Sequence, residues 1–114
     1  MTILFILNDA PYGNERCYNA LRLAKTLAGK GAQVVLFLMA DAVSCAKSGQ
    51  KPPQGYYNIE LMTKAVARSG EVLLCGTCMD ARGIGEEELL DGARRSTLDE
   101  LADRTLAADQ VLVF

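Results

Sequence analysis

Four short stretches of the chain are apolar at nearly every position. These stretches are residues 2–7, 33–38, 71–75 and 110–114. A strand with one face in water alternates between apolar and polar residues, whereas a strand buried on both faces is apolar throughout. The pattern therefore predicts four strands of a parallel sheet whose two faces are both covered.

Between these stretches, apolar residues recur every three or four positions, which is the spacing of one face of a helix. The spacing predicts helices over residues 14–27, 41–47, 57–68 and 97–106. The last helix is expected to begin at Thr97, which forms the pattern of a capping box with Glu100. The residues expected on its inner face are Leu98, Leu101, Ala102 and Thr105.

The alternation of strands and helices predicts one small α/β domain over residues 1–114. Its sheet is expected to be doubly wound and mainly parallel, with helices on both faces. Residues 48–55 contain two consecutive prolines and are predicted to form a loop. Ligands of such sheets bind beyond the carboxyl ends of the strands. The loops that begin at Asn8, Met39 and Gly76 are therefore expected to form the functional edge.

The composition narrows the chemistry that this edge can perform. The chain has 114 residues, no histidine and a formal net charge of −2. Ser-His-Asp hydrolases, Cys-His proteases and His-ligated zinc enzymes cannot be built from it alone. No basic stripe favours nucleic acid, and Arg94 and Arg95 are expected at the surface, where a partner contact is possible. No stretch is long enough to cross a membrane and no signal peptide opens the chain, so we expect a cytoplasmic protein without a membrane partner.

Four cysteines remain as candidates for chemistry, and in the cytoplasm they are expected to be reduced. Cys78 lies in a glycine-flanked segment after the third predicted strand. Backbone N–H groups and the Arg82 cation would favour its thiolate, whereas Asp80 would oppose it. The segment predicts a nucleophilic or sulfur-carrying Cys78. The alternative is a small apolar side chain in a loop.

Cys75 and Cys78 also match the bare C-x-x-C pattern. A thioredoxin-like dithiol needs a substantial helix that begins at the first cysteine, and Gly83 and Gly85 follow too soon for one. A structural zinc ion would need a second pair of ligands, so no metal is expected. A reversible disulfide between Cys75 and Cys78 remains open, although Cys75 is more simply explained as a buried strand end.

Other candidate residues have both a structural and a functional interpretation. Cys17 is expected in the core, and Cys45 is a weak candidate for assisting Cys78. Asn8, Asp9 and Tyr12 predict a turn and a helix cap, or a polar wall of the site, and both can hold. Neither a phosphate-binding loop nor a dinucleotide fingerprint is present, so no cofactor is expected.

The segment Cys75-Gly76-Thr77-Cys78-Met79-Asp80-Ala81-Arg82-Gly83 resembles the signature loop of the DsrE/DsrF-like proteins. Residues 39–43 and 49–53, and the opening strand followed by Asn8-Asp9, are also similar to that family. The resemblance covers essentially the whole chain, and the cysteine loop is its specific part. It implies a flavodoxin-like fold and assembly into a homo-trimer or homo-hexamer. Tyr56, Tyr57 and Met62 are side chains that suit such an interface, although plain core packing is the alternative and the stronger explanation for Met62.

The resemblance also implies a function, because sulfur-relay members of the family carry sulfane sulfur as a persulfide on the cysteine that maps onto Cys78. Cys78 is expected to take sulfur from a donor protein and pass it to an acceptor, without a cofactor. Arg82 would stabilise the anion, and Cys75 could resolve the persulfide as sulfide and a disulfide. The residues expected around the sulfur are Asn8, Asp9, Tyr12, Gly76, Thr77 and Asp80. Two alternatives remain: a non-catalytic oligomeric module that binds a small ligand or a partner, and a Cys75/Cys78 dithiol redox protein.

Overall fold

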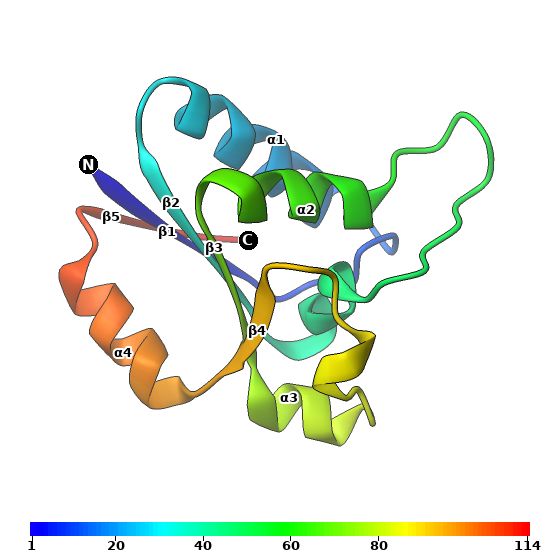
Figure 1. Cartoon of the computed structure of the whole chain (residues 1–114). Helices are drawn as coiled ribbons and strands as arrows, with labels where there is room; N and C mark the ends of the chain where they lie inside the picture. The colour runs from blue at the N-terminus through cyan, green and yellow to red at the C-terminus, as the bar shows by residue number, and fades with distance from the viewer.

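Five parallel strands form one sheet in the computed structural model, which describes residues 1–114 (Figure 1). The strands are β1 (Thr2–Leu7), β2 (Gln33–Leu38), β3 (Glu71–Cys75), β4 (Ala93–Ser96) and β5 (Gln110–Val113). They lie in the order β4-β3-β2-β1-β5, and every neighbouring pair is parallel. The predicted parallel sheet is confirmed, and β1, β2 and β3 have the predicted bounds.

Helices cover both faces of the sheet, as predicted. The helical elements are α1 (Arg16–Gly29), η1 (Ala40–Ala46), α2 (Ile59–Ser69), α3 (Gly76–Ala81), η2 (Glu86–Glu88) and α4 (Leu98–Ala107). Phe5 and Leu36 lie in the large core under α1 and α2, whereas Phe37 and Cys75 belong to a smaller cluster with Leu101 of α4. Side chains alternate across a strand, so one apolar stretch supplies both clusters. None of the helices combines the length and the hydropathy that a membrane crossing requires.

Capping side chains set the beginnings of two helices. The Asn58 side chain accepts a hydrogen bond from a backbone N–H of the first turn, so α2 begins at Ile59 rather than at residue 57. Thr97 caps α4 by accepting a hydrogen bond from the Glu100 N–H, as predicted. The second half of the predicted capping box is absent, because the Glu100 carboxylate pairs with Arg94 instead of reaching back to Thr97.

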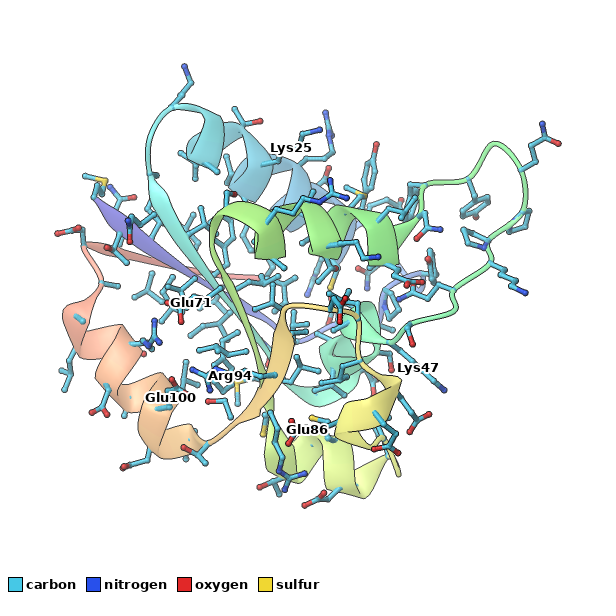
Figure 2. All side chains as sticks on the ribbon, in the orientation of Figure 1. Lys25, Lys47, Glu71, Glu86, Arg94 and Glu100 are labelled. Carbon is cyan, nitrogen blue, oxygen red and sulfur yellow. The ribbon has the colours of Figure 1, made fainter.

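The helix α4 buries less of its predicted inner face than expected. Leu101 is its buried residue, whereas Leu98 is 68 % exposed. The predicted inner residues Ala102 and Thr105 are exposed as well. Leu101 packs against the central strands β1, β2 and β3, and ion pairs complete the contact. Figure 2 shows Arg94 of β4 facing Glu100 of α4, and Arg104 of α4 pairs with a glutamate at the start of β3.

The two edge strands differ from the predicted pattern. The sequence does not reveal β4, because Ala93–Ser96 contains no apolar stretch and pairs only with β3. At the other edge, β5 ends at Val113, and its Val111 and Val113 side chains are exposed although residues 110–114 read as a buried strand. Both differences have one cause: an edge strand has fewer neighbours to bury it.

The segments between β2 and α2 position the functional edge. The predicted helix at residues 41–47 is instead the tighter 3₁₀ helix η1. Residues 48–55 form the expected loop, which extends away from the body of the molecule (Figure 1). Gly70 ends α2 against β2, and a side chain at that position would collide with the Val34 carbonyl. That close approach allows α2 to turn directly into β3.

Candidate functional site

The two cysteines of the C-x-x-C segment lie at the carboxyl edge of the sheet, where β3 turns into α3 (Figure 1). Cys75 is the last residue of β3 and caps α3. The segment after β3, which was expected to be a loop, is the short helix α3. No substantial helix forms, in agreement with the prediction from Gly83 and Gly85. Gly83 has a left-handed φ of 65° and ends α3 in Schellman geometry after six residues, through N–H groups bonded to Asp80 and Met79 carbonyls.

The two thiols differ in exposure and in their electrostatic surroundings. Cys75 is 8 % exposed, whereas Cys78 is half-buried. The Cys78 backbone N–H donates a hydrogen bond to Cys75 Sγ at 3.4 Å. Burial, and after it the side-chain hydrogen bond with Cys78, raise the pKa of the Cys75 thiol above its ordinary value. Cys78 is therefore the accessible sulfur, and Cys75 is a protonated thiol beside it.

The Arg82 guanidinium binds α3 to η1 rather than either sulfur. Its Nε and Nη2 donate to Asp41 Oδ1 at 3.0 and 2.8 Å. Its Nη1 donates to the Cys78 carbonyl oxygen at 3.1 Å. The predicted partner of Arg82 was the Cys78 thiolate, whereas the observed contacts fix the Cys78 backbone. Asp41 is a residue that sequence reasoning missed, because it lies 41 positions away from Arg82.

Arg95 of β4 reaches the start of α3 from the other side. Its Nη1 and Nη2 donate to the two Asp80 carboxylate oxygens at 2.7 and 2.8 Å. The hydrogen bond from Arg95 lowers the pKa of the Asp80 carboxyl, so this pair is charged. The guanidinium also covers Gly76, where a Cβ atom would lie 2.7 Å from Arg95 Nε. Sequence reasoning placed Arg95 only at the surface, because β4 has no apolar pattern that would reveal a strand.

Asn8 and Asp9 stabilise the ends of neighbouring elements. The backbone and side-chain N–H groups of Asn8 donate to the Phe114 carbonyl at 2.9 and 3.4 Å. Asp9 accepts a hydrogen bond from Asn14 and forms an ion pair with Arg16 at the start of α1. The structural half of the prediction, a turn at the start of a helix, agrees with these contacts. No hydrogen bond or ion pair joins either residue to the cysteine segment.

Tyr12 fastens the long loop before α2. Its hydroxyl donates to Gln50 Oε1 at 2.6 Å and accepts from the Ile59 N–H at 3.1 Å. The Gln50 amide in turn donates to three carbonyls at the end of η1, those of Ser44, Cys45 and Lys47. Tyr12 therefore joins the loop at residues 48–55 and is not hydrogen-bonded to Cys78. Nothing in the sequence distinguishes Gln50 from any other loop glutamine.

The other two cysteines are fully buried together under the same edge. Cys17 lies in the core as predicted, and its Sγ donates to the Asp9 carbonyl at 3.1 Å. A hydrogen bond with Cys17, and burial after it, raise the pKa of Cys45 well above its ordinary value. Cys45, a weak candidate for assisting Cys78, has no access to solvent, and the partner of its thiol is Cys17.

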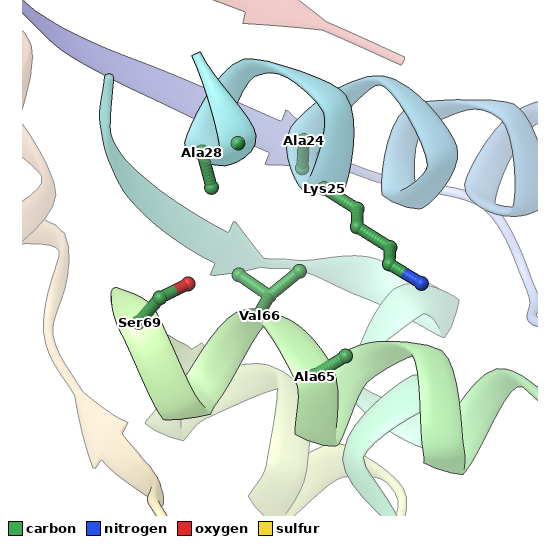
Figure 3. Close-up of a pocket in the computed structure, with 7 residues that line it drawn as sticks. Ala24, Lys25, Ala28, Ala65, Val66 and Ser69 are labelled. Atoms are coloured by element: carbon green, nitrogen blue, oxygen red, sulfur yellow. The ribbon is translucent and has the colours of Figure 1, made fainter. Parts of the chain in front are cut away.

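The cavities of the surface lie away from the cysteines. Figure 3 shows a shallow hollow of about 300 Å³ between α1 and α2, where small side chains face one another. Another, of about 490 Å³, lies beside Tyr12 and the loop. None of the four cavities is lined by Cys75 or Cys78. The half-buried Cys78 thus reaches the surface outside any of these cavities, with Cys75 buried beside it, and no cluster of potential metal ligands accompanies the pair.

Proteins of similar sequence and structure match the whole chain. The DsrE/DsrF-like family matches residues 1–114. Protein YchN of Escherichia coli strain K12 is 45 % identical over 114 residues, which cover 98 % of this chain and 97 % of YchN. The crystal structure of the ychN protein from E. coli has a TM-score of 0.93 at 46 % identity and covers 100 % of this chain and 99 % of that one. A protein of unknown function from Methanobacterium thermoautotrophicum shares the fold, with a TM-score of 0.77 at 11 % identity and coverage of 99 % and 97 %.

Proposed function

The chain belongs to the DsrE/DsrF-like family, and from this premise we propose that it carries sulfane sulfur as a persulfide on Cys78. The observation that supports the proposal is the contrast between the two thiols of α3. Cys78 is accessible, whereas Cys75 is buried and has a raised pKa. The thiolate is the attacking form of a cysteine, so an accessible sulfur is suited to receive an atom from another protein.

Loading and transfer are two exchanges of the same kind. The Cys78 thiolate attacks the outer sulfur of a donor persulfide, a sulfur–sulfur bond forms on Cys78, and the donor leaves as a thiolate with the electron pair of the broken bond. An acceptor thiolate then attacks the outer sulfur of the Cys78 persulfide and releases the Cys78 thiolate. Neither exchange changes the total oxidation state, so no cofactor is required. Arg82 serves as a positioning residue, because it holds the Cys78 carbonyl.

Cys75 provides a second reaction that removes the sulfane sulfur from Cys78. The Cys75 thiol loses its proton and attacks Cys78 Sγ, the bond to the outer sulfur breaks, and that sulfur leaves as hydrogen sulfide with the proton. The two cysteines are oxidised to a disulfide while the sulfane sulfur is reduced to sulfide. The hydrogen bond from the Cys78 N–H to Cys75 Sγ, which brings the Cys75 sulfur to the Cys78 backbone, supports this step.

The same hydrogen bond favours one other function, a dithiol redox protein. Cys75 caps α3 and Cys78 is the third residue of that helix. This C-x-x-C placement at the start of a helix is common to redox-active dithiols. In that case Cys75 and Cys78 would exchange a disulfide with a partner, without sulfane sulfur.

We propose proteins rather than small molecules as donor and acceptor, because no cavity encloses the thiol pair. We also propose a homo-trimer or homo-hexamer, as the family resemblance implies. The exposed apolar side chains available to its interfaces include Tyr56, Leu61, Leu98, Leu106 and Val113. The reaction needs reduced thiols, so we propose the cytoplasm as its compartment.

Intact-mass measurement after incubation of the reduced protein with a persulfide donor tests the proposal. Wild type and Cys75→Ser should gain the mass of one sulfur atom, and Cys78→Ser should gain none. Cys45→Ser is the matched control, because it removes a buried thiol and should load like wild type. A protein that gains no sulfur, or gains it equally in Cys78→Ser, would refute sulfur carriage on Cys78. A loss of two hydrogens that needs both Cys75 and Cys78, without prior gain of sulfur, would support the dithiol function instead.

A further inference from the structure

Arg95 lies across the turn that joins the two cysteines. The turn runs from Cys75, the last residue of β3, through Gly76 into α3. The Arg95 guanidinium covers Gly76 and binds both carboxylate oxygens of Asp80, which lies two residues beyond Cys78. A planar, two-pronged contact of this kind fixes direction as well as distance. The contact therefore connects β4 to α3 over the point where the chain changes direction.

We propose that Arg95 is a positioning residue for the thiol pair. By binding the Asp80 carboxylate across Gly76, Arg95 fixes the angle between β3 and α3. This angle keeps Cys75 Sγ next to the Cys78 backbone N–H. The inference deepens the proposed function, because release of sulfide requires Cys75 to reach Cys78. The same geometry would serve a dithiol function equally.

The alternation of side chains along β4 explains why Arg95, and not its neighbour, has this task. Arg94 and Arg95 point to opposite faces of the strand. Arg94 binds both carboxylate oxygens of Glu100 on α4 at 2.9 and 2.7 Å (Figure 2). Both arginines make the same kind of contact with similar distances, but only that of Arg95 reaches α3. Arg94 is therefore a matched control for the loss of one arginine–carboxylate pair.

Two arginine–carboxylate ion pairs, here called braces, join α3 to neighbouring elements. Arg82, which follows the last residue of α3, binds Asp41 of η1, and Asp80, the last residue but one of α3, binds Arg95 of β4. The Gly76 contact belongs to the Arg95 brace alone. An alanine at Gly76 meets only the end of a flexible side chain, so it should displace the guanidinium without removing any charge. It therefore perturbs the brace independently of the arginine itself.

The equilibrium between the Cys75–Cys78 dithiol and glutathione disulfide tests the proposal without any sulfur donor. Glutathione disulfide is reduced as the two cysteines are oxidised, so the balance reports how easily their sulfurs meet. Arg95→Gln and Gly76→Ala should each weaken the protein disulfide about tenfold, which corresponds to roughly 30 mV for this two-electron couple. Arg94→Gln should leave the equilibrium within about twofold of wild type. Arg95→Lys should restore part of the loss, because its ammonium still pairs with Asp80.

The proposal is overturned if Arg95→Gln matches wild type, or if Arg94→Gln shifts the equilibrium as far as Arg95→Gln does. It is also overturned if wild type forms no Cys75–Cys78 disulfide. Thermal unfolding of the variants separates position from general stability, since both arginine variants lose one comparable ion pair. Sulfur loading of Cys78 is read separately by intact mass, so failure of the brace and failure of sulfur carriage give different results.

Discussion

Leu101→Ala should detach α4 from the sheet and uncover Cys75. Leu101 is 7 % exposed, and it is the only buried residue of α4. It belongs to the same apolar cluster as Cys75, Phe37 and Leu73. The other contacts of α4 with the sheet include ion pairs that are partly exposed, and each such pair contributes about 0–1 kcal/mol. One leucine therefore supplies most of the attachment.

The magnitude follows from that burial. Truncation of a buried leucine to alanine lowers the free energy of unfolding by about 2–5 kcal/mol, and the cost falls when the site can collapse. Because the cluster around Leu101 contains only six buried residues and α4 can settle onto the sheet, we expect about 2–3 kcal/mol. Leu106 offers a control on the same helix, because it is 87 % exposed. Leu106→Ala should change the free energy of unfolding by less than about 0.5 kcal/mol.

Urea unfolding and alkylation of the native protein measure the two consequences. Leu101→Ala should lower the unfolding midpoint, and Cys75 should react faster with iodoacetamide than it does in wild type. Leu106→Ala should change neither value. If Leu101→Ala costs no more than Leu106→Ala, Leu101 does not hold α4. If the stability falls but Cys75 stays unreactive, the burial of Cys75 does not depend on α4.

Three further predictions follow from local geometry. Gly70→Ala should lower the free energy of unfolding by at least about 2 kcal/mol, because the new methyl group meets the Val34 carbonyl. Gly29→Ala places its methyl group in open space and should be neutral or stabilising. Urea unfolding of both variants measures the difference. Hydrogen bonds that Arg94 and Ser96 donate lower the pKa of the Glu100 carboxyl to about 2. The ionised carboxylate therefore stabilises the fold by about 1 kcal/mol after allowance for exposure, and this stabilisation is present above the unfolded pKa of about 4.3 and is lost as the pH falls towards 2. Urea unfolding of Glu100→Gln should lack this change with pH. Tyr12→Phe loses two hydrogen bonds to the loop and the start of α2, so the amides of that segment should exchange faster with deuterium, and unchanged exchange would refute the fastening role.

The central part of the fold could be predicted from the sequence, and its edges could not. The strands β1, β2 and β3 are buried on both faces, so each leaves a continuous apolar stretch with clear ends. The strand β4 has one neighbour and consists of Ala93–Ser96, so no hydrophobic pattern marks it. The helix α3 has six residues, too few to establish a periodic pattern.

The candidate site was predicted to the level of its segment but not to the level of its contacts. The position of Cys78 after a strand is enough to place it at the carboxyl edge of the sheet. The partners of Arg82 and Asp80 depend on chain crossings from η1 and β4, which no local pattern encodes. Tyr12 was grouped with the cysteines because its loop also follows a strand. That loop instead folds against the long segment before α2.

A time course of a single turnover tests the central claim most directly. Reduced wild-type protein is mixed with one equivalent of a persulfide donor, and peptide mass mapping follows each cysteine while released sulfide is measured. We expect the added sulfur to appear first on Cys78, and sulfide and the Cys75–Cys78 disulfide to follow later in equal amounts. Sulfur that appears first on another cysteine, or a disulfide that forms with no preceding persulfide on Cys78, would contradict the account.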